Sequence, residues 1–155
     1  LLYQQDGEWQ LESFDCTTDP GLYYRENPIN LDGMAIVAPG QYRSLWTFGK
    51  HQGRYDALVQ NKPISVYRDN NHDQNIDTNV PIYTGFYGIN CHRASQRHRS
   101  QIVDRWSAGC QVIACPNEFD AVMSLCRASA GLYGNTFTYT LLTEQQILDF
   151  INQPV

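Results

Sequence analysis

The chain has 155 residues, of which 42% are hydrophobic and 17% are charged, and its formal net charge is −5. This length and composition predict one globular domain over 1–155 with a substantial core. The negative charge argues against nucleic-acid binding. The sequence contains no run of about eighteen apolar residues, which is the length that a membrane-spanning helix needs. The chain does not begin with methionine, and we expect that a signal peptide has been removed.

Short strands are predicted along most of the chain, and ten tyrosines and three tryptophans favour such a β-rich fold. Strands are expected over 8–14 and 29–37, and another begins at Gly40. A hairpin turn over 49–53 leads into a returning strand over 55–60. Further strands are expected at 64–67, 83–92 and 135–142, with a strand or turn at 106–114.

Two helices are predicted near the C-terminus. Pro116 begins the first, over about 116–130, where apolar residues recur at helical spacing until Gly131. A capping-box pattern at Thr143 begins the second, over about 144–152. Its apolar residues are expected to face inward; they are Ile147, Leu148 and Ile151. The predicted architecture is therefore a mainly β sandwich or barrel with two peripheral helices.

The chemically informative feature is a histidine followed by a cysteine. Cys110 comes eighteen residues after His92, and Ser107 and Gly109 stand directly before the sulfur. A cysteine attacks as its thiolate, and an imidazole can take the thiol proton. A turn of small residues can aim backbone N–H groups at a developing oxyanion. The pattern indicates acyl transfer by a cysteine nucleophile.

The order of these residues argues against the papain-like arrangement, in which the cysteine precedes the histidine. All four histidines precede Cys110, so only Cys16 could follow that order. The total of five cysteines is odd, which suits a nucleophile that stays unpaired. Cys115 and Cys126 form a disulfide or are small buried residues, and Cys91 is expected to pack on the face opposite His92.

The motif resembles the catalytic motif of the L,D-transpeptidase (YkuD-type) family, in which a strand histidine is followed by Ser-His-Gly-Cys. His92 matches the family histidine, Cys110 its nucleophile, and Ser107 and Gly109 its serine and glycine. The segment 38–42 resembles the family's Thr-Pro-x-Gly-x-Tyr/Phe segment in shortened form, and Gly88-Ile89 resembles its Gly-Ile-His strand. The resemblance covers roughly 34–114.

Three features depart from the family pattern. Ala108 replaces the second histidine, and Gln111 and Val112 stand where the family often has arginine or asparagine. Asn90 and Cys91 intrude before His92. These departures bear on the substrate and the exact reaction more than on the nucleophile.

The resemblance implies an enzyme that acts on peptidoglycan stem peptides in the periplasm or outside a bacterial cell, with no required cofactor. Cys110 would form a thioester, with His92 as base, and pass the acyl group to an amine or to water. Backbone N–H groups of Cys110 and of Gly109 or Ala108 would hold the oxyanion. Ser107 is the expected orienter of His92, and Asp104 is the alternative.

Substrate binding is expected around the loop between the two halves of the motif. Five basic side chains crowd this loop, namely Arg93, Arg97, His98, Arg99 and Arg105. Arg93 and Arg105 are the favoured partners for stem-peptide carboxylates, because arginine binds carboxylates with two hydrogen bonds. Trp106, Tyr87 and Tyr42 could wall the cleft or belong to the core.

A polar loop over 69–77 carries oxygen-bearing residues at alternate positions, as the first part of a calcium loop does. The candidate ligands are Asp69, Asn71, Asp73, Asn75 and Asp77. The alternative is a hairpin loop built from Asx turns. At the level of the whole chain, the alternatives to the enzyme are an inactive cell-wall or calcium-binding module of the same fold, and a cysteine amidase acting on another substrate.

Overall fold

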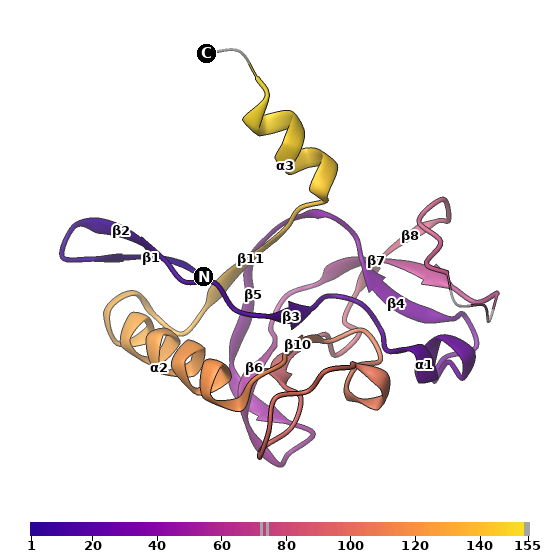
Figure 1. The fold of residues 1–155 in the computed structure, drawn as a ribbon, viewed down its shortest axis with the longest axis horizontal. Coiled ribbons are helices and arrows are strands. Elements are labelled where there is room, and N and C mark those ends of the chain that lie inside the picture. The colour runs from indigo at the N-terminus through magenta and orange to yellow at the C-terminus, as the bar shows by residue number, and fades with distance from the viewer. Residues whose placement is uncertain (72, 74, 154–155) are drawn as a thin grey trace.

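The structure is a computed structural model that describes residues 1–71, 73 and 75–153. Within these residues the chain is mainly β, and a curled six-stranded sheet forms its centre (Figure 1). In spatial order the strands of this sheet are β11 (Phe137–Leu141), β5 (Gly40–His51), β6 (Tyr55–Gln60), β9 (Cys91–Arg93), β10 (Gln111–Ile113) and β3 (Cys16–Thr17). The mainly β prediction is confirmed at this coarse level.

Smaller elements surround the central sheet. A three-stranded sheet consists of β4 (Met34–Val37), β7 (Ile64–Asp69) and β8 (Ile82–Gly85), and a separate hairpin consists of β1 (Leu2–Gln5) and β2 (Glu8–Leu11). The helices are α1 (Leu22–Glu26), α2 (Pro116–Tyr133) and α3 (Glu144–Ile151), with a 3-10 turn at Asp104–Trp106. None of the helices in the described residues is long and apolar enough to cross a membrane.

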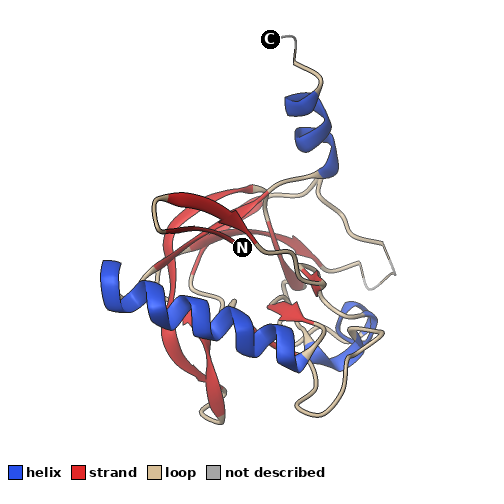
Figure 2. Ribbon diagram, turned by 60° about the vertical axis from the view of Figure 1, so that its left-hand side comes forward, coloured by secondary structure: helices blue, strands red, loops and turns tan. Residues whose placement is uncertain are grey.

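The core lies between the two larger sheets and α2, which runs along one side of the central sheet (Figure 2). The apolar face of α2 is turned inward by Phe119, Val122, Met123 and Cys126, at the helical spacing that the sequence predicted. Strand β4, an edge strand of the three-stranded sheet, is buried at all four positions. Cys91 belongs to this core, as predicted.

The pairing of β9 with β10 decides where the candidate site residues lie. These strands are parallel, and Val112 lies opposite His92. Two parallel neighbours require a crossover connection of a dozen or more residues. The segment 94–110 is this crossover, so the chain returns with Cys110 beside the beginning of β9. The eighteen-residue spacing of the motif is therefore the length of a crossover loop.

The expected strand over 83–92 is interrupted in the structure. Strand β8 ends at Gly85 and β9 begins at Cys91. The side chain of Gln60 holds the intervening segment, because its Oε1 accepts from the backbone N–H groups of Tyr87 and Ile89, each at 3.0 Å, and its Nε2 donates to the Gly85 carbonyl at 2.9 Å. The Gln60 side chain thus satisfies backbone groups between β8 and β9 that a neighbouring strand would otherwise pair with.

Other boundaries differ less from expectation. Strand β6 matches its predicted bounds of 55–60, whereas the strands predicted over 8–14 and 29–37 shrink to β2 and β4. Helix α2 continues past Gly131 to Tyr133, and Gly134 ends it with a φ of 94°. The short helix α1 was not predicted.

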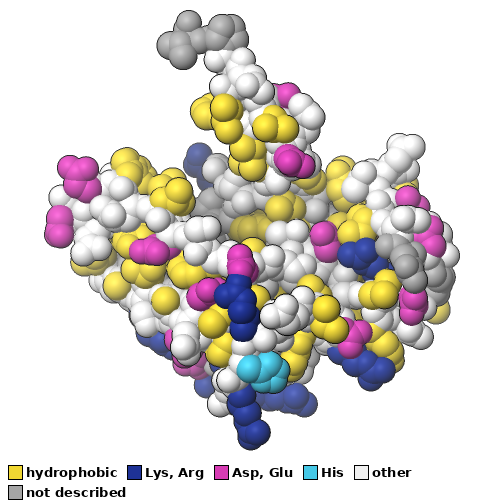
Figure 3. Space-filling model, in the orientation of Figure 1, with side chains coloured by type: hydrophobic (Ala, Val, Ile, Leu, Met, Phe, Trp, Pro, Cys, Tyr) yellow, Lys and Arg dark blue, Asp and Glu magenta, His cyan; other side chains and the backbone are white. Residues whose placement is uncertain are grey.

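Helix α3 contradicts the expectation that its apolar residues face inward. It begins with the predicted Thr143–Gln146 capping box, but none of its residues is buried. Ile147, Leu148 and Ile151 remain 45%, 44% and 69% exposed. Figures 1 and 3 show the helix standing away from the body with hydrophobic side chains on its surface. An amphipathic pattern defines an apolar face, but it does not supply a partner for that face.

Two phenylalanines on helices provide a matched test of this packing. Phe119 of α2 is 1% exposed, whereas Phe150 of α3 is 76% exposed. We expect Phe119→Ala to lower the free energy of unfolding by about 3–5 kcal/mol, because it leaves a cavity in the core. Phe150→Ala should change it by less than about 0.5 kcal/mol. Urea denaturation of both variants measures this, and equal losses would contradict the observed packing of α3.

Candidate catalytic site

Three side chains from different elements converge at the centre of the candidate site. His51 ends β5, His92 lies in β9, and Cys110 directly precedes β10. One ring nitrogen of each histidine and the Cys110 sulfur all lie within 4.8 Å of one another. The structure therefore brings together the two residues of the predicted pair, His92 and Cys110, and adds a second histidine.

The hydrogen bonds of His92 fix its neutral tautomer. Its Nδ1 lies 2.7 Å from the carbonyl oxygen of Arg93, which only accepts, so Nδ1 carries the proton. The Tyr55 hydroxyl donates to the same carbonyl at 3.3 Å. The other ring nitrogen, Nε2, is therefore a lone-pair atom, and it is buried without a hydrogen-bond partner among the described residues. Burial lowers the pKa of His92 to about 4, which keeps the ring neutral.

Cys110 lies between two backbone groups. Its thiol donates to the Gly88 carbonyl at 3.5 Å, and the N–H of Asn90 donates to its sulfur at 3.5 Å. Burial raises the pKa of Cys110, while the bond from Asn90 opposes that rise. The resting pair is therefore a neutral thiol beside a neutral imidazole. Such a pair reacts when the base takes the proton as the sulfur attacks.

Ser107 and Gly109 shape the turn that presents the sulfur. The Ser107 hydroxyl donates to the Cys110 carbonyl at 2.7 Å and accepts from the Gly109 N–H at 3.0 Å. The expected bond from Ser107 to His92 is therefore replaced, because the carbonyl of Arg93 orients the ring. Asp104, the alternative orienter, is an exposed residue of the 3-10 turn. Since Gly109 N–H is already bonded, the N–H groups of Cys110 and Ala108 are left as candidate oxyanion donors.

The Gln111 side chain stabilises this turn from the interior of the protein. This buried side chain accepts from the Tyr139 hydroxyl at 2.7 Å and donates to the Gly109 carbonyl at 3.3 Å. The sequence comparison with the family placed Gln111 where a substrate-holding residue often stands. In this structure the residue is internal and links β11 to the turn before Cys110.

His51 is the residue that sequence reasoning missed. Its ring stacks on that of His92, with 3.9 Å between centroids. Its Nδ1 lies 3.2 Å from the side-chain amide nitrogen of Asn90, so Nδ1 accepts and the neutral ring carries its proton on Nε2. Burial lowers the pKa of His51 as well. The sequence placed this residue in a hairpin turn, and only the pairing of β6 with β9 brings that end of the hairpin to His92.

The predicted substrate-binding arginines contact aromatic rings. The guanidinium of Arg93 lies 3.9 Å from the centre of the Tyr55 ring, beside the hydroxyl that shares a carbonyl with His92. Arg105 lies over Tyr23 at 3.8 Å, between the 3-10 turn and α1. Arg93 therefore lies closer to the contacts of His92, whereas Arg105 helps join two surface elements.

The three aromatic candidates occupy different surroundings. Tyr42 packs against the core and donates to the Ala38 carbonyl at 2.6 Å. Tyr87 also packs against the core, beneath the Arg68 guanidinium at 4.7 Å. Trp106 is 44% exposed on the 3-10 turn. The first two residues therefore have core contacts, which leaves Trp106 as the aromatic residue with a largely open surface.

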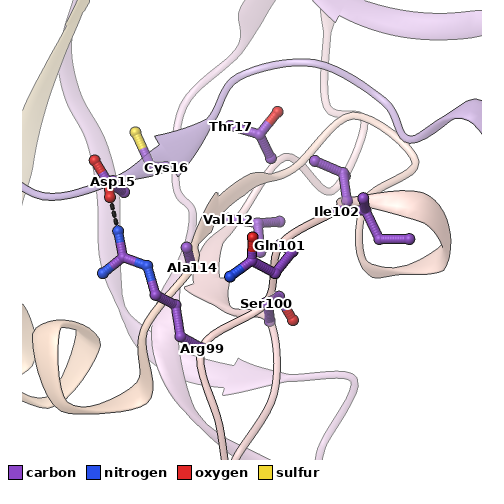
Figure 4. A pocket seen from close by; sticks show the side chains of 11 residues that line it. Asp15, Cys16, Thr17, Arg99, Ser100, Gln101, Ile102, Val112 and Ala114 are labelled. Atoms are coloured by element: carbon purple, nitrogen blue, oxygen red, sulfur yellow. Dashed lines mark ion pairs between the residues drawn. The ribbon is translucent and has the colours of Figure 1, made fainter.

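A cavity of about 310 Å³ lies under the crossover loop (Figure 4). Arg99 reaches across it to Asp15, and also contacts Glu118 at 3.2 Å. Cys16, the other cysteine considered from sequence order, lines this cavity from β3. The ion pairs of Arg99 tie the crossover loop to β3 and α2, so they contribute to placing the loop that carries Cys110.

The loop over 69–77 is described except for residues 72 and 74. Its side-chain oxygens accept from backbone N–H groups two residues on, as Asn71 does from Asp73 at 3.1 Å and Asp73 does from Asn75 at 2.7 Å. Asp69 accepts from Asp77 N–H at 3.2 Å. The two bonds to the residue two positions on are the Asx turns of the alternative interpretation. Calcium binding by this loop stays a prediction.

The five cysteines are free in the structure. Cys126 is buried on the inner face of α2, and Cys115 is the residue directly before that helix. The reading of Cys126 as a small buried residue agrees with this placement.

Comparisons of the chain with protein-family models, curated proteins and solved structures found no significant match. The resemblance to L,D-transpeptidases therefore rests on the motif residues themselves. The function assigned to this site has to be argued from its chemistry.

Gly109, in the turn before Cys110, has no space for a side chain. Its φ is 136°, and a Cβ would lie 2.4 Å from the Ala35 carbonyl oxygen. We expect Gly109→Ala to cost about 2–4 kcal/mol of unfolding free energy and to displace the turn before Cys110. Gly131→Ala is the matched control, because its helical site is open and alanine should stabilise it by about 0.5–1 kcal/mol. Thermal denaturation of both variants distinguishes them, and equal effects would contradict the geometry.

The neutral resting pair predicts how Cys110 alkylation depends on pH. Because burial raises the pKa of Cys110, the rate with iodoacetamide should climb about tenfold per pH unit through neutrality and level off only above the usual thiol pKa of ~8.5. Peptide mapping by mass spectrometry follows this residue separately, with Cys110→Ala as the blank. A plateau between about pH 5 and pH 8 would instead indicate a standing thiolate–imidazolium pair.

Proposed function

We propose that this chain is a cysteine acyl-transfer enzyme that acts on peptidoglycan stem peptides, as an L,D-transpeptidase or an L,D-carboxypeptidase or endopeptidase. The observation that carries the proposal is the approach of the Cys110 sulfur to an imidazole whose buried Nε2 is a free lone pair. A buried polar atom without a partner is costly, so its retention argues for a function. The simplest function for Nε2 is that of a general base for the Cys110 thiol.

The proposed reaction has two steps. His92 Nε2 takes the proton of Cys110 as the sulfur attacks the carbonyl carbon of the donor peptide bond. The N–H groups of Cys110 and Ala108 hold the oxyanion, and the C–N bond breaks as His92 returns the proton to the leaving amine. An acceptor amine or water then attacks the thioester, His92 takes its proton, the C–S bond breaks, and the proton returns to the Cys110 sulfur.

Two structural features support this chemistry. The tautomer of His92 is set by the fixed carbonyl of Arg93, so the base needs no reorganisation before it acts. The bond from Asn90 N–H to the sulfur favours the thiolate as it forms. Nε2 makes no hydrogen bond to any described residue, and catalytic hydrogen bonds often tighten only when substrate binds.

The substrate class is the part of the proposal that depends on the motif resemblance. Stem peptides carry several carboxylates, and the Arg93 guanidinium lies over the ring of Tyr55, whose hydroxyl bonds to the carbonyl that orients His92. Exposed Trp106, near the end of the crossover loop, offers an aromatic surface. A periplasmic or secreted location follows from the same substrate.

The test is incubation of the full chain with purified stem tetrapeptides and an acceptor stem, read by mass spectrometry. The parent should release terminal D-alanine and pass through an acyl adduct on Cys110. Cys110→Ala should form neither, and His92→Gln should lower turnover about 100- to 10,000-fold, because it removes the base. Cys16→Ala is the matched control, since it removes an exposed thiol outside the site.

The mass of the product separates the two reactions, because transfer joins two stems whereas hydrolysis adds water. Product from an isolated non-wall amide alone would favour the amidase reading. Absence of both product and adduct would overturn the proposal and favour a module of the same fold that binds without turnover.

A further inference from the structure

The donor atoms around Cys110 match the ligand set of a transition-metal site. We propose that Cys110 Sγ, His92 Nε2 and a ring nitrogen of His51 bind one divalent ion of the zinc class, which reversibly blocks the nucleophile. The binding site stands on its own geometry, and only the blocking role rests on the proposed function. The sequence alone did not indicate this site, because it did not connect His51 with the other two residues.

Convergence is the first argument. The three residues come from β5, β9 and the turn before β10, and one ring nitrogen of each histidine and the Cys110 sulfur lie within 4.8 Å of one another. Among the described residues this is the group of histidine, cysteine and acidic side chains that lies close enough to share an ion. Zinc binds sulfur at about 2.3 Å and imidazole nitrogen at about 2.0–2.1 Å, which puts tetrahedral donors roughly 3.5 Å apart. Movements of about an ångström would close the site around an ion.

The orientation of His92 is the second argument. Its Nδ1–H donates to the Arg93 carbonyl at 2.7 Å, and its Nε2 is buried and has no partner in the described part of the chain. Metal-binding histidines almost always donate their other N–H in this manner, which fixes the ring and raises its basicity. An ion at Nε2 would satisfy the one ring atom that the fold leaves without a hydrogen bond.

His51 has to adjust more than His92. The two rings are stacked with 23° between their planes, and an ion must lie close to the plane of each ring it binds. His51 must therefore turn, and it gives up the hydrogen bond from Asn90 to its Nδ1. His51 ends β5 beside the turn and is more exposed than His92, which is 2% exposed.

Binding of the ion requires the loss of one proton and no redox change. The ion takes the sulfur lone pair, the thiol proton leaves to solvent, and neither sulfur nor metal changes oxidation state. Three protein ligands leave the fourth position of a tetrahedral ion open, on the side where Cys110 is partly exposed. A sulfur bound to the ion cannot attack a carbonyl, and a chelator restores the thiol.

The experiment uses the full chain with Zn²⁺ alone, in the absence of any peptide. Isothermal titration calorimetry of the reduced protein should give one ion per chain. Cys110→Ala should abolish this binding, and His51→Gln should weaken it at least tenfold. His98→Gln is the matched control, because His98 is exposed and bonds to Ser95 rather than to the site, and it should bind as the parent does.

Substitution of Co²⁺ for Zn²⁺ reads the ligands directly in the parent protein, so the result does not depend on a variant folding. A thiolate-to-cobalt charge-transfer band with intense tetrahedral d–d bands is expected. Absence of saturable one-to-one binding, absence of the thiolate band, or a folded His51→Gln that binds as tightly as the parent would overturn the site. If the protein turned over no peptide, the metal-binding results would still be valid. The two proposals are therefore tested independently.

Discussion

Asn90 makes the interaction on which the candidate site depends. Its N–H donates to the Cys110 sulfur, its carbonyl accepts from Gln111 N–H, its side-chain oxygen accepts from Gln60 N–H, and its side-chain nitrogen donates to His51. One residue therefore joins β5, β6 and β10 at the point where the sulfur is presented. The departure from the family motif at this position supplies the junction that holds the site together.

Burial gives this junction its chemical consequence. Removing His92 and Cys110 from water disfavours both the imidazolium and the thiolate, so the resting pair is neutral. The lone pair on His92 Nε2 is consequently available. It can accept the thiol proton or coordinate a metal ion. The proposed reaction and the proposed inhibition thus follow from one physical property of the site.

Local pattern and tertiary packing contributed differently to the fold. The bounds of β6, the inward face of α2 and the capping box of α3 follow from alternation, helical spacing and side-chain hydrogen bonds between residues close in sequence. The break before β9 does not follow from local pattern, because it depends on Gln60 of another strand. The exposure of α3 does not either, because it depends on the absence of packing against the rest of the described residues.

The sequence by itself determined the order of histidine before cysteine and the small residues of the turn, and from these it predicted the nucleophile. It also determined a crossover-length spacing between His92 and Cys110, although it did not show that the flanking strands are parallel. Only the tertiary structure decided that Arg93 orients the base, that Ser107 holds the turn, and that His51 completes the cluster. These contacts join residues through strand pairing, and pairing depends on the whole sheet rather than on neighbours in the chain.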